Sequence, residues 1–181
     1  SFMPYCFTHI VFSWFFTKIY SFFNKVKFSS WQWFALLFGS VFPDIDFIIQ
    51  LTTHYKIHRL FTHSIFMIIS GFLLACIALF IIKKVFKQKF NIYHVAVFFS
   101  IGLFSHVLLD MIFGWPGVGL LWPYKTLWFY FFGTSHGYTS SLVSEKTISD
   151  IIKTLRWALF DIGLGVLWLF YLMYSKKVKE F

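Results

Sequence analysis

The chain has 181 residues, of which 59% are apolar, 25% are aromatic and only 13% are charged. A soluble domain has about 45–50% apolar and about 25% charged residues, so this composition excludes an ordinary soluble domain and indicates an integral membrane protein. The net charge of +9 does not indicate nucleic acid, because Lys and Arg collect in the cytoplasmic loops of membrane proteins. We therefore expect the lipid bilayer, and no nucleic acid, as a partner.

The apolar runs predict an all-α fold, a polytopic membrane helix bundle that forms a single integral membrane domain over residues 1–181. Lipid admits only helices and closed barrels, and these runs lack the alternation of barrel strands. We expect about five transmembrane segments. In chain order they are residues 4–23, 31–42, 61–82, 92–113 and 151–174.

The second of these segments is too short to cross a bilayer. Its twelve residues span about 18 Å as a helix, at about 1.5 Å per residue, whereas the hydrocarbon core is about 30 Å thick. Pro43 ends the segment, because proline disfavours helix in the residue before it. Asp44 and Asp46 should therefore lie below the membrane surface, on irregular backbone that is shielded from lipid.

A long connection follows the fourth segment. Residues 124–150 are expected to form an outer interfacial or re-entrant loop, in which the aromatic stretch 127–132 is too short to cross. Residues 151–181 then form the last span and a basic cytoplasmic tail.

Three basic clusters set the expected orientation. They lie at residues 18–27, 83–89 and 176–179, and placing any one of them in the cytoplasm places all three there. The N-terminus is then outside and the C-terminus cytoplasmic. We expect a multi-pass protein of the cell inner (cytoplasmic) membrane, with its functional site facing the non-cytoplasmic side.

This topology brings histidine and aspartate from four segments to one depth near the outer face. Charged groups inside a bilayer cost several kcal/mol and indicate function. His106 and Asp110 are four residues apart, so they share a helix face and can chelate one ion. Mixed imidazole and carboxylate ligands suit zinc, with manganese or iron as alternatives. The candidate metal ligands are His9, Asp44, Asp46, His58, His63, His106 and Asp110.

Other polar residues keep simpler interpretations. His94 falls at the cytoplasmic end of the fourth segment, on the wrong side for this cluster, and His54 is expected in a solvated loop. His136 is on the correct side but in a flexible-looking loop. Asp161 is either a further ligand or a partner of Arg156.

The ordered motifs of the first two thirds of the chain resemble those of the YdjM-like family, which is described as inner-membrane-associated metal-dependent hydrolases. The resemblance covers roughly residues 8–123. The motifs are Phe7-Thr8-His9, Phe42-Pro43-Asp44-Ile45-Asp46, His58-Arg59-Leu60-Phe61-Thr62-His63-Ser64, Ser105-His106-Val107-Leu108-Leu109-Asp110 and Gly117-Val118-Gly119-Leu120-Leu121-Trp122-Pro123. More distantly, the His and Asp pattern is similar to that of the zinc-dependent phospholipase C and P1 nuclease group, which implies a phosphoester or phospholipid substrate.

We therefore predict a membrane-embedded metal-dependent hydrolase with one to three metal ions, in which a metal-activated water cleaves a phosphoester or phospholipid. Asp44, His63, His106 and Asp110 are the expected direct ligands. Asp46 or His58 would be a general base or would orient a ligand. Arg59 would bind a substrate phosphate through its planar guanidinium, or would instead snorkel at the membrane interface.

Two other functions explain the same histidines. A metal-ion or proton transporter would use the His and Asp cluster as part of a path across the membrane. However, only His94 and Cys76 offer ligands toward the cytoplasmic half, which favours a dead-end site. Haem bound between histidines would leave the carboxylates without a role.

Overall fold

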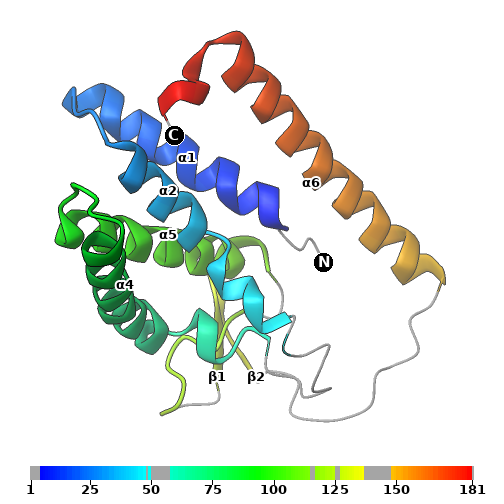
Figure 1. The fold of residues 1–181 in the computed structure, drawn as a ribbon. Coiled ribbons are helices and arrows are strands. Elements are labelled where there is room, and N and C mark those ends of the chain that lie inside the picture. Colours follow the sequence, from blue (N-terminus) through cyan, green and yellow to red (C-terminus); the bar gives the residue numbers. More distant parts are fainter. Residues whose placement is uncertain are drawn as a thin grey trace.

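The structure is a computed structural model that describes residues 5–47, 49, 58–114, 117–124, 127–136 and 148–180. Within them the chain is mostly helical, which confirms the predicted class of fold (Figure 1). The long helices are α1 (Cys6–Asn24), α2 (Ser30–Gly39), α4 (Ile65–Val85), α5 (Ile92–Phe113) and α6 (Ile148–Tyr174). The short elements are the 3-10 turns η1 (Phe42–Asp44), η2 (Phe61–His63) and η3 (Lys177–Glu180), and the strands β1 (Leu127–Tyr130) and β2 (Gly133–His136).

Three of these helices are long and apolar enough to cross a membrane. Among the described residues they are α4, α5 and residues Ile151–Tyr174 of α6, judged by length and composition. The predicted short second segment is also present, because α2 ends at Gly39 and the chain turns into η1. The total of five spans, and which end faces the cytoplasm, stay predictions.

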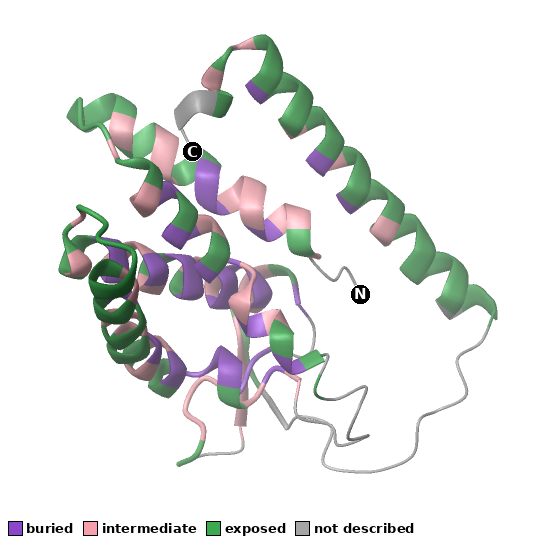
Figure 2. Cartoon of the chain, viewed as in Figure 1, coloured by how far each residue is buried: buried purple, intermediate pink, exposed green. Residues whose placement is uncertain are grey.

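The exposed and buried surfaces have the polarity that a lipid-facing protein requires. Figure 2 shows that α4 and α6 are exposed over most of their length, and their exposed side chains include Ile69, Leu74 and Phe170. The fully buried side chains, in contrast, include His63, His106 and other polar groups. Apolar side chains thus cover the outside of these helices, whereas the buried interior holds polar groups beside its apolar core, as expected where lipid is the solvent.

Helix α5 packs against α1, α2 and α4, and α6 packs against α1. Helix α5 contacts α2 at Gly39 and Gly102, where a Cβ atom on either residue would overlap the backbone of the facing helix. This close approach brings the end of α2, and the η1 turn that follows it, next to the last two turns of α5. On another side of α5, the hydroxyl of Ser105 lies 2.5 Å from that of Ser13 in α1.

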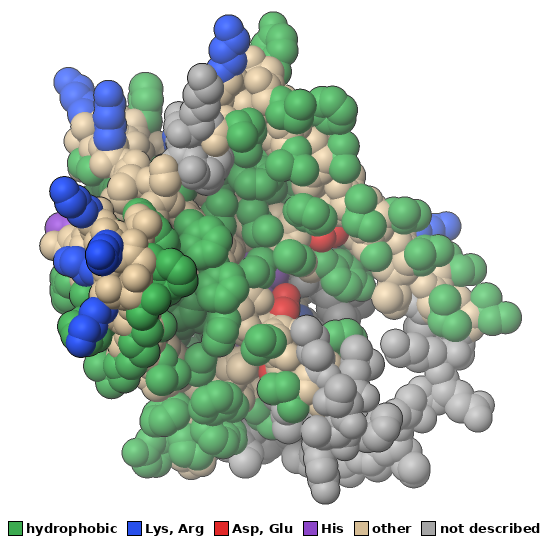
Figure 3. All heavy atoms as spheres, viewed as in Figure 1, with side chains coloured by type: hydrophobic (Ala, Val, Ile, Leu, Met, Phe, Trp, Pro, Cys, Tyr) green, Lys and Arg blue, Asp and Glu red, His purple; other side chains and the backbone are tan. Residues whose placement is uncertain are grey.

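The basic clusters gather at one end of the bundle, away from η1 and η2. Figure 3 shows most Lys and Arg side chains at the end where α1 stops, α4 joins α5, and α6 stops. Helices α1 and α6 run in parallel, because Trp14 packs on Trp168 while Phe7 lies beside Gly165. This arrangement agrees with the placement of the three clusters on one side of the membrane.

The connection after α5 contains β structure, which differs from the predicted all-α fold. This structure is the β1–β2 hairpin and a bridge between Val118 and Phe129. Residues 127–132, expected as an aromatic stretch at the interface, contain β1, which pairs antiparallel with β2. Phe129 and Val118 exchange backbone hydrogen bonds of 2.8 and 2.9 Å, and Phe131 N donates to Met111 O at 2.8 Å. Aromatic residues favour strands where their side chains pack on a neighbouring segment. Here that segment is the loop after α5, which contains Val118. Residues 137–147, within the expected outer loop, lie outside the described residues.

Asp161 has a role that the sequence did not indicate. Its carboxylate accepts hydrogen bonds from the backbone of Phe7 at 3.1 Å and of Thr8 at 2.6 Å, and from the Thr8 hydroxyl at 2.5 Å. The first N–H groups of a helix lack partners within it and favour a nearby negative charge. Asp161 therefore caps α1 and joins it to α6, instead of acting as a metal ligand or as a partner of Arg156.

Candidate metal centre

Five of the predicted ligands converge on one small volume. They come from the start of α1 (His9), from η1 (Asp44), from η2 (His63) and from the end of α5 (His106 and Asp110). His63 Nε2 lies 3.1 Å from His106 Nε2 and 3.3 Å from Asp110 Oδ2. His106 Nε2 lies 3.5 Å from Asp44 Oδ1, and His9 Nε2 lies 3.6 Å from Asp110 Oδ1.

The backbone of Ser40 fixes which nitrogen of His106 faces this centre. His106 Nδ1 donates a hydrogen bond to the Ser40 carbonyl oxygen at 2.7 Å. A carbonyl can only accept, so Nδ1 carries the proton, and Nε2 of the neutral ring presents its lone pair to the centre. Metal-binding histidines are held in this way, by a hydrogen bond from the ring nitrogen that is not a ligand.

Thr62 and Asp46 orient His63 so that its Nε2, like that of His106, faces the centre. The Thr62 hydroxyl donates to Asp46 Oδ2, and therefore accepts the hydrogen bond that joins it to His63 Nδ1 at 2.9 Å. Nδ1 of His63 then carries a proton, and in the neutral ring Nε2 is an acceptor too. Two acceptor nitrogens 3.1 Å apart repel each other unless a cation binds both of them.

The separations match those expected around a metal ion. With zinc–nitrogen bonds of 2.0–2.1 Å, tetrahedral geometry places two ligand nitrogens about 3.3 Å apart. The distances among His63, His106, Asp110 and Asp44 run from 3.1 to 3.9 Å. Within the part of the chain that the structure describes, three groups of residues have ligand atoms within 4.8 Å of one another. The groups are His9–Asp44–His106, Asp44–His58–His63 and His63–His106–Asp110.

His9 provides a separate indication of a ligand. Its side chain is 1% exposed, and neither ring nitrogen has a hydrogen-bond partner among the described residues. Leaving a buried polar group without a partner costs about 1–3 kcal/mol. The ring stacks on that of His106, with centroids 3.7 Å apart. Stacking on His106 thus holds His9 beside the centre, and its ring nitrogens stay available to bind a metal ion.

A proton competes for the same position as a metal. Burial disfavours a charged His63, but its hydrogen bonds with Asp110 and Asp46 outweigh burial and raise its pKa to about 9. When no metal is bound, that proton separates the facing nitrogens of His63 and His106. Metal binding at neutral pH must therefore displace a proton.

Asp46 organises the loop that carries the outer residues of the cluster. It accepts from His58 Nδ1 at 2.7 Å, from the backbone of Arg59 at 3.2 Å and from the Thr62 hydroxyl. Burial alone would raise the pKa of Asp46, but its hydrogen bonds with His58 and His63 keep it below the ordinary value. Asp46 therefore stays ionised and orients two histidines, which is one of the two roles expected for it.

Arg59 lies inside the cluster. It is 3% exposed, with Nε 3.2 Å from Asp110 Oδ2 and Nη2 3.4 Å from Asp110 Oδ1. Its backbone is left-handed, with φ of 68°, which turns the side chain inward beneath Gly114. The alternative that Arg59 snorkels at the membrane interface is wrong, because Asp110 holds the guanidinium in the interior.

The charges of the cluster match one divalent cation. With neutral histidines, the three carboxylates and the Arg59 guanidinium carry a formal charge of −2. Such a charge in a buried site requires compensation. The cluster opens on the side of Asp44 and His58, whose side chains are 35% and 23% exposed, whereas those of His63, His106 and Asp110 are buried.

The one further histidine whose side chain the structure describes, His94, lies away from this cluster. His94 lies in the first turn of α5, at the basic end, as predicted. His136 is in β2, but its side chain, and the whole of His54, lie outside the described residues. Thr62 and Ser40 are the supporting residues that the sequence analysis missed. Thr62 stood beside His63 in the quoted motif, whereas the role of the Ser40 carbonyl depends on the α2–α5 contact.

These features define a helical membrane protein with a buried His and Asp cluster that could hold a metal ion. A family model described as YdjM inner membrane protein matches residues 3–178, so the chain belongs to this family. The match extends the predicted resemblance beyond Pro123, through α6. No curated protein and no solved structure matches the chain.

Proposed function

We propose that the protein is a membrane-embedded hydrolase that cleaves a phosphoester bond, with a phospholipid as the substrate class and zinc as its metal. His9, Asp44, His63, His106 and Asp110 would hold the ion. The observation that supports this proposal is the pair of Nε2 atoms on His63 and His106, 3.1 Å apart and each fixed by a hydrogen bond on its other nitrogen. A metal ion that displaces the proton between them would find both nitrogens already turned toward it.

A bound divalent ion would supply Lewis acidity and a water of lowered pKa. The Asp46–His58 pair is suited to take up a proton at the mouth of the site. Asp46 accepts from His58 Nδ1 at 2.7 Å, which selects the tautomer whose Nε2 can accept a proton and stabilises the imidazolium that results. Arg59 is proposed as a positioning residue that acts through Asp110, in place of direct binding to a phosphate.

A lipid substrate is supported by what surrounds the opening. Next to Asp44 and His58, the side chains of Ile45, Phe47 and Phe61 are 44%, 48% and 41% exposed. A water-soluble substrate would have to cross this apolar rim, whereas a membrane lipid already lies against it.

The interior between the cluster and the basic end favours a hydrolase over a transporter. Below the cluster, the described core is an apolar group that includes Ala35, Leu79, Val95, Phe99 and Leu103. A transport path for ions or protons needs polar groups at successive depths. The cluster is thus proposed as a dead-end site.

The first experiment measures metal content and hydrolysis on the same preparations. Protein purified in detergent should contain about one zinc per chain, and His106→Ala should lose it, whereas His94→Ala, at the far end of α5, should keep it. Phospholipids and soluble phosphoesters are then incubated with each protein, with and without a chelator. Absence of stoichiometric metal in a folded wild-type protein would refute the metal centre. Metal without chelator-sensitive hydrolysis would refute the hydrolase.

A further inference from the structure

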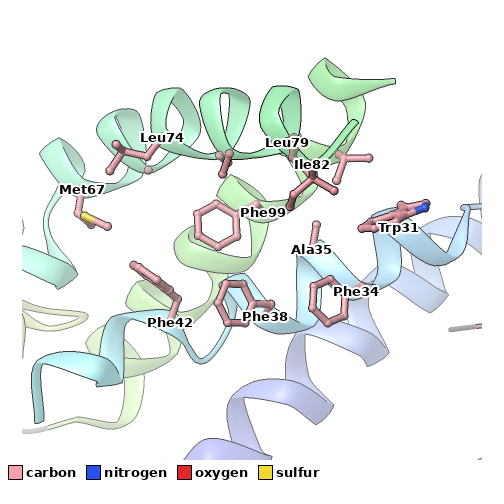
Figure 4. Close-up of a pocket in the computed structure, with 14 residues that line it drawn as sticks. Trp31, Phe34, Ala35, Phe38, Phe42, Met67, Leu74, Leu79, Ile82 and Phe99 are labelled. Carbon is pink, nitrogen blue, oxygen red and sulfur yellow. The ribbon is translucent and has the colours of Figure 1, made fainter. Parts of the chain in front are cut away.

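An apolar groove runs along the bundle between α2 and α4, with α5 as its floor. Figure 4 shows Phe34, Phe38 and Phe42 on one wall, Met67 and Leu74 on the other, and Phe99 between them. Its volume is about 240 Å³ and its lining residues are all apolar or aromatic. Gly71 of α4 faces Leu103 there, and a Cβ on Gly71 would come 2.6 Å from the Leu103 side chain.

One end of the groove adjoins the metal cluster. Phe42 is two residues before Asp44 in η1, and Met67 lies one turn after His63, where its backbone N–H donates to Ser64 at 3.1 Å. The other end lies at Trp31 and Ile82, beside the basic end. From Met67 to Ile82 the helix rises about 22 Å, at about 1.5 Å per residue. This length exceeds one leaflet of a hydrocarbon core about 30 Å thick.

The lining of the groove selects its occupant. All of its lining residues are apolar or aromatic, so a hydrocarbon chain fills the groove without leaving a buried polar group unpaired. A long and narrow apolar space of this kind fits one extended hydrocarbon chain.

We infer that the groove binds one acyl chain of the lipid substrate, with the ester end at Phe42 and Met67 and the methyl end at Trp31 and Ile82. This inference rests on the proposed function, and it identifies the substrate as a lipid that the protein takes directly from the membrane. The acyl chain fixes the position of the headgroup, so that the scissile phosphoester is placed at Asp44 and His58, the exposed side of the cluster.

The test uses phosphatidylglycerol with a photoreactive diazirine in one palmitoyl chain, in nanodiscs that contain the full chain. A diazirine next to the ester should label the groove near Phe42 and Met67, and a diazirine at the terminal methyl should label it near Trp31 and Ile82. Ala78→Phe, which adds a ring inside the groove, should reduce both labels about tenfold, the factor expected from losing the burial of about two methylene groups. Ile77→Phe, at a neighbouring exposed position outside the groove, should leave them unchanged.

Hydrolysis separates this inference from the proposed function. Ala78→Phe should reduce cleavage of the palmitoyl lipid about tenfold, by the same loss of methylene burial, and leave cleavage of a soluble dibutyryl lipid unchanged. Cleavage of neither lipid, together with correct labelling, would refute the hydrolase and support the groove. Labels in the reverse order, labels outside the groove, or a groove residue that crosslinks to a second copy of the chain would overturn the inference whatever the activity.

Discussion

The proton on His63 predicts how metal affinity depends on pH. The pKa of His63 is raised to about 9 by Asp110 and Asp46, so below that pH its Nε2 carries a proton that a metal must displace. Releasing one proton makes the apparent association constant fall tenfold for each pH unit below about 9. Between pH 9 and pH 6 the loss is about a thousandfold, or about 4 kcal/mol at 1.36 kcal/mol per unit.

A competition titration with a fluorescent zinc indicator measures this dependence. The logarithm of the affinity should rise with a slope near one from pH 6 to pH 8.5 and then level off, after correction for the indicator itself. In Asp46→Asn the pKa of His63 should be lower, because one of its two carboxylate partners is lost, and the affinity should level off at a lower pH. An affinity that does not change with pH in the wild-type protein would refute the proton on His63.

Three further predictions concern the groups that build the site. Gly102→Ala should lower the free energy of unfolding in detergent by about 1–3 kcal/mol through overpacking, since its Cβ would overlap α2. Gly163→Ala is the matched control, because a Cβ there meets nothing within 4 Å, and it should be neutral or stabilising. Asp161→Ala should lower the melting temperature without changing metal content, and a loss of metal would instead make Asp161 a ligand. Thr62→Val should weaken zinc binding about 10–100-fold, the usual effect of removing a residue that orients a ligand, and unchanged affinity in the indicator titration would remove Thr62 from that role.

The sequence predicted the long helices well because lipid leaves the backbone few choices. The expected segment 92–113 has the bounds of α5. The Asn91 side chain caps its start by accepting a hydrogen bond from His94 N at 3.2 Å. Pro43 correctly predicted that the second segment is short. The helix α2 ends earlier than expected, at Gly39, which lies against Phe99 of α5. The predicted depth of each residue in the membrane then indicated that five residues lie near one another: His9, Asp44, His63, His106 and Asp110.

The parts that the sequence did not reveal depend on contacts between distant segments. The capping of α1 by Asp161 joins residues 153 positions apart, and no local pattern distinguishes it from a metal ligand. The inward position of Arg59 depends on its left-handed backbone and on Asp110, 51 residues later. The hairpin of β1 and β2 depends on a neighbouring loop, because a strand needs a partner outside its own segment.

The fold and the chemistry of this chain are connected through charge. A cluster with a formal charge of −2 cannot stay buried near a bilayer without a counter-charge, because an isolated charge there costs several kcal/mol. Arg59 compensates Asp110 but leaves two carboxylates, and protonation of His63 compensates one of them. A divalent ion that replaces the His63 proton completes the neutralisation. Metal binding should therefore stabilise the η1 and η2 turns together with the ends of α1 and α5, so that the same ion that would polarise a substrate also holds the four segments of the site together.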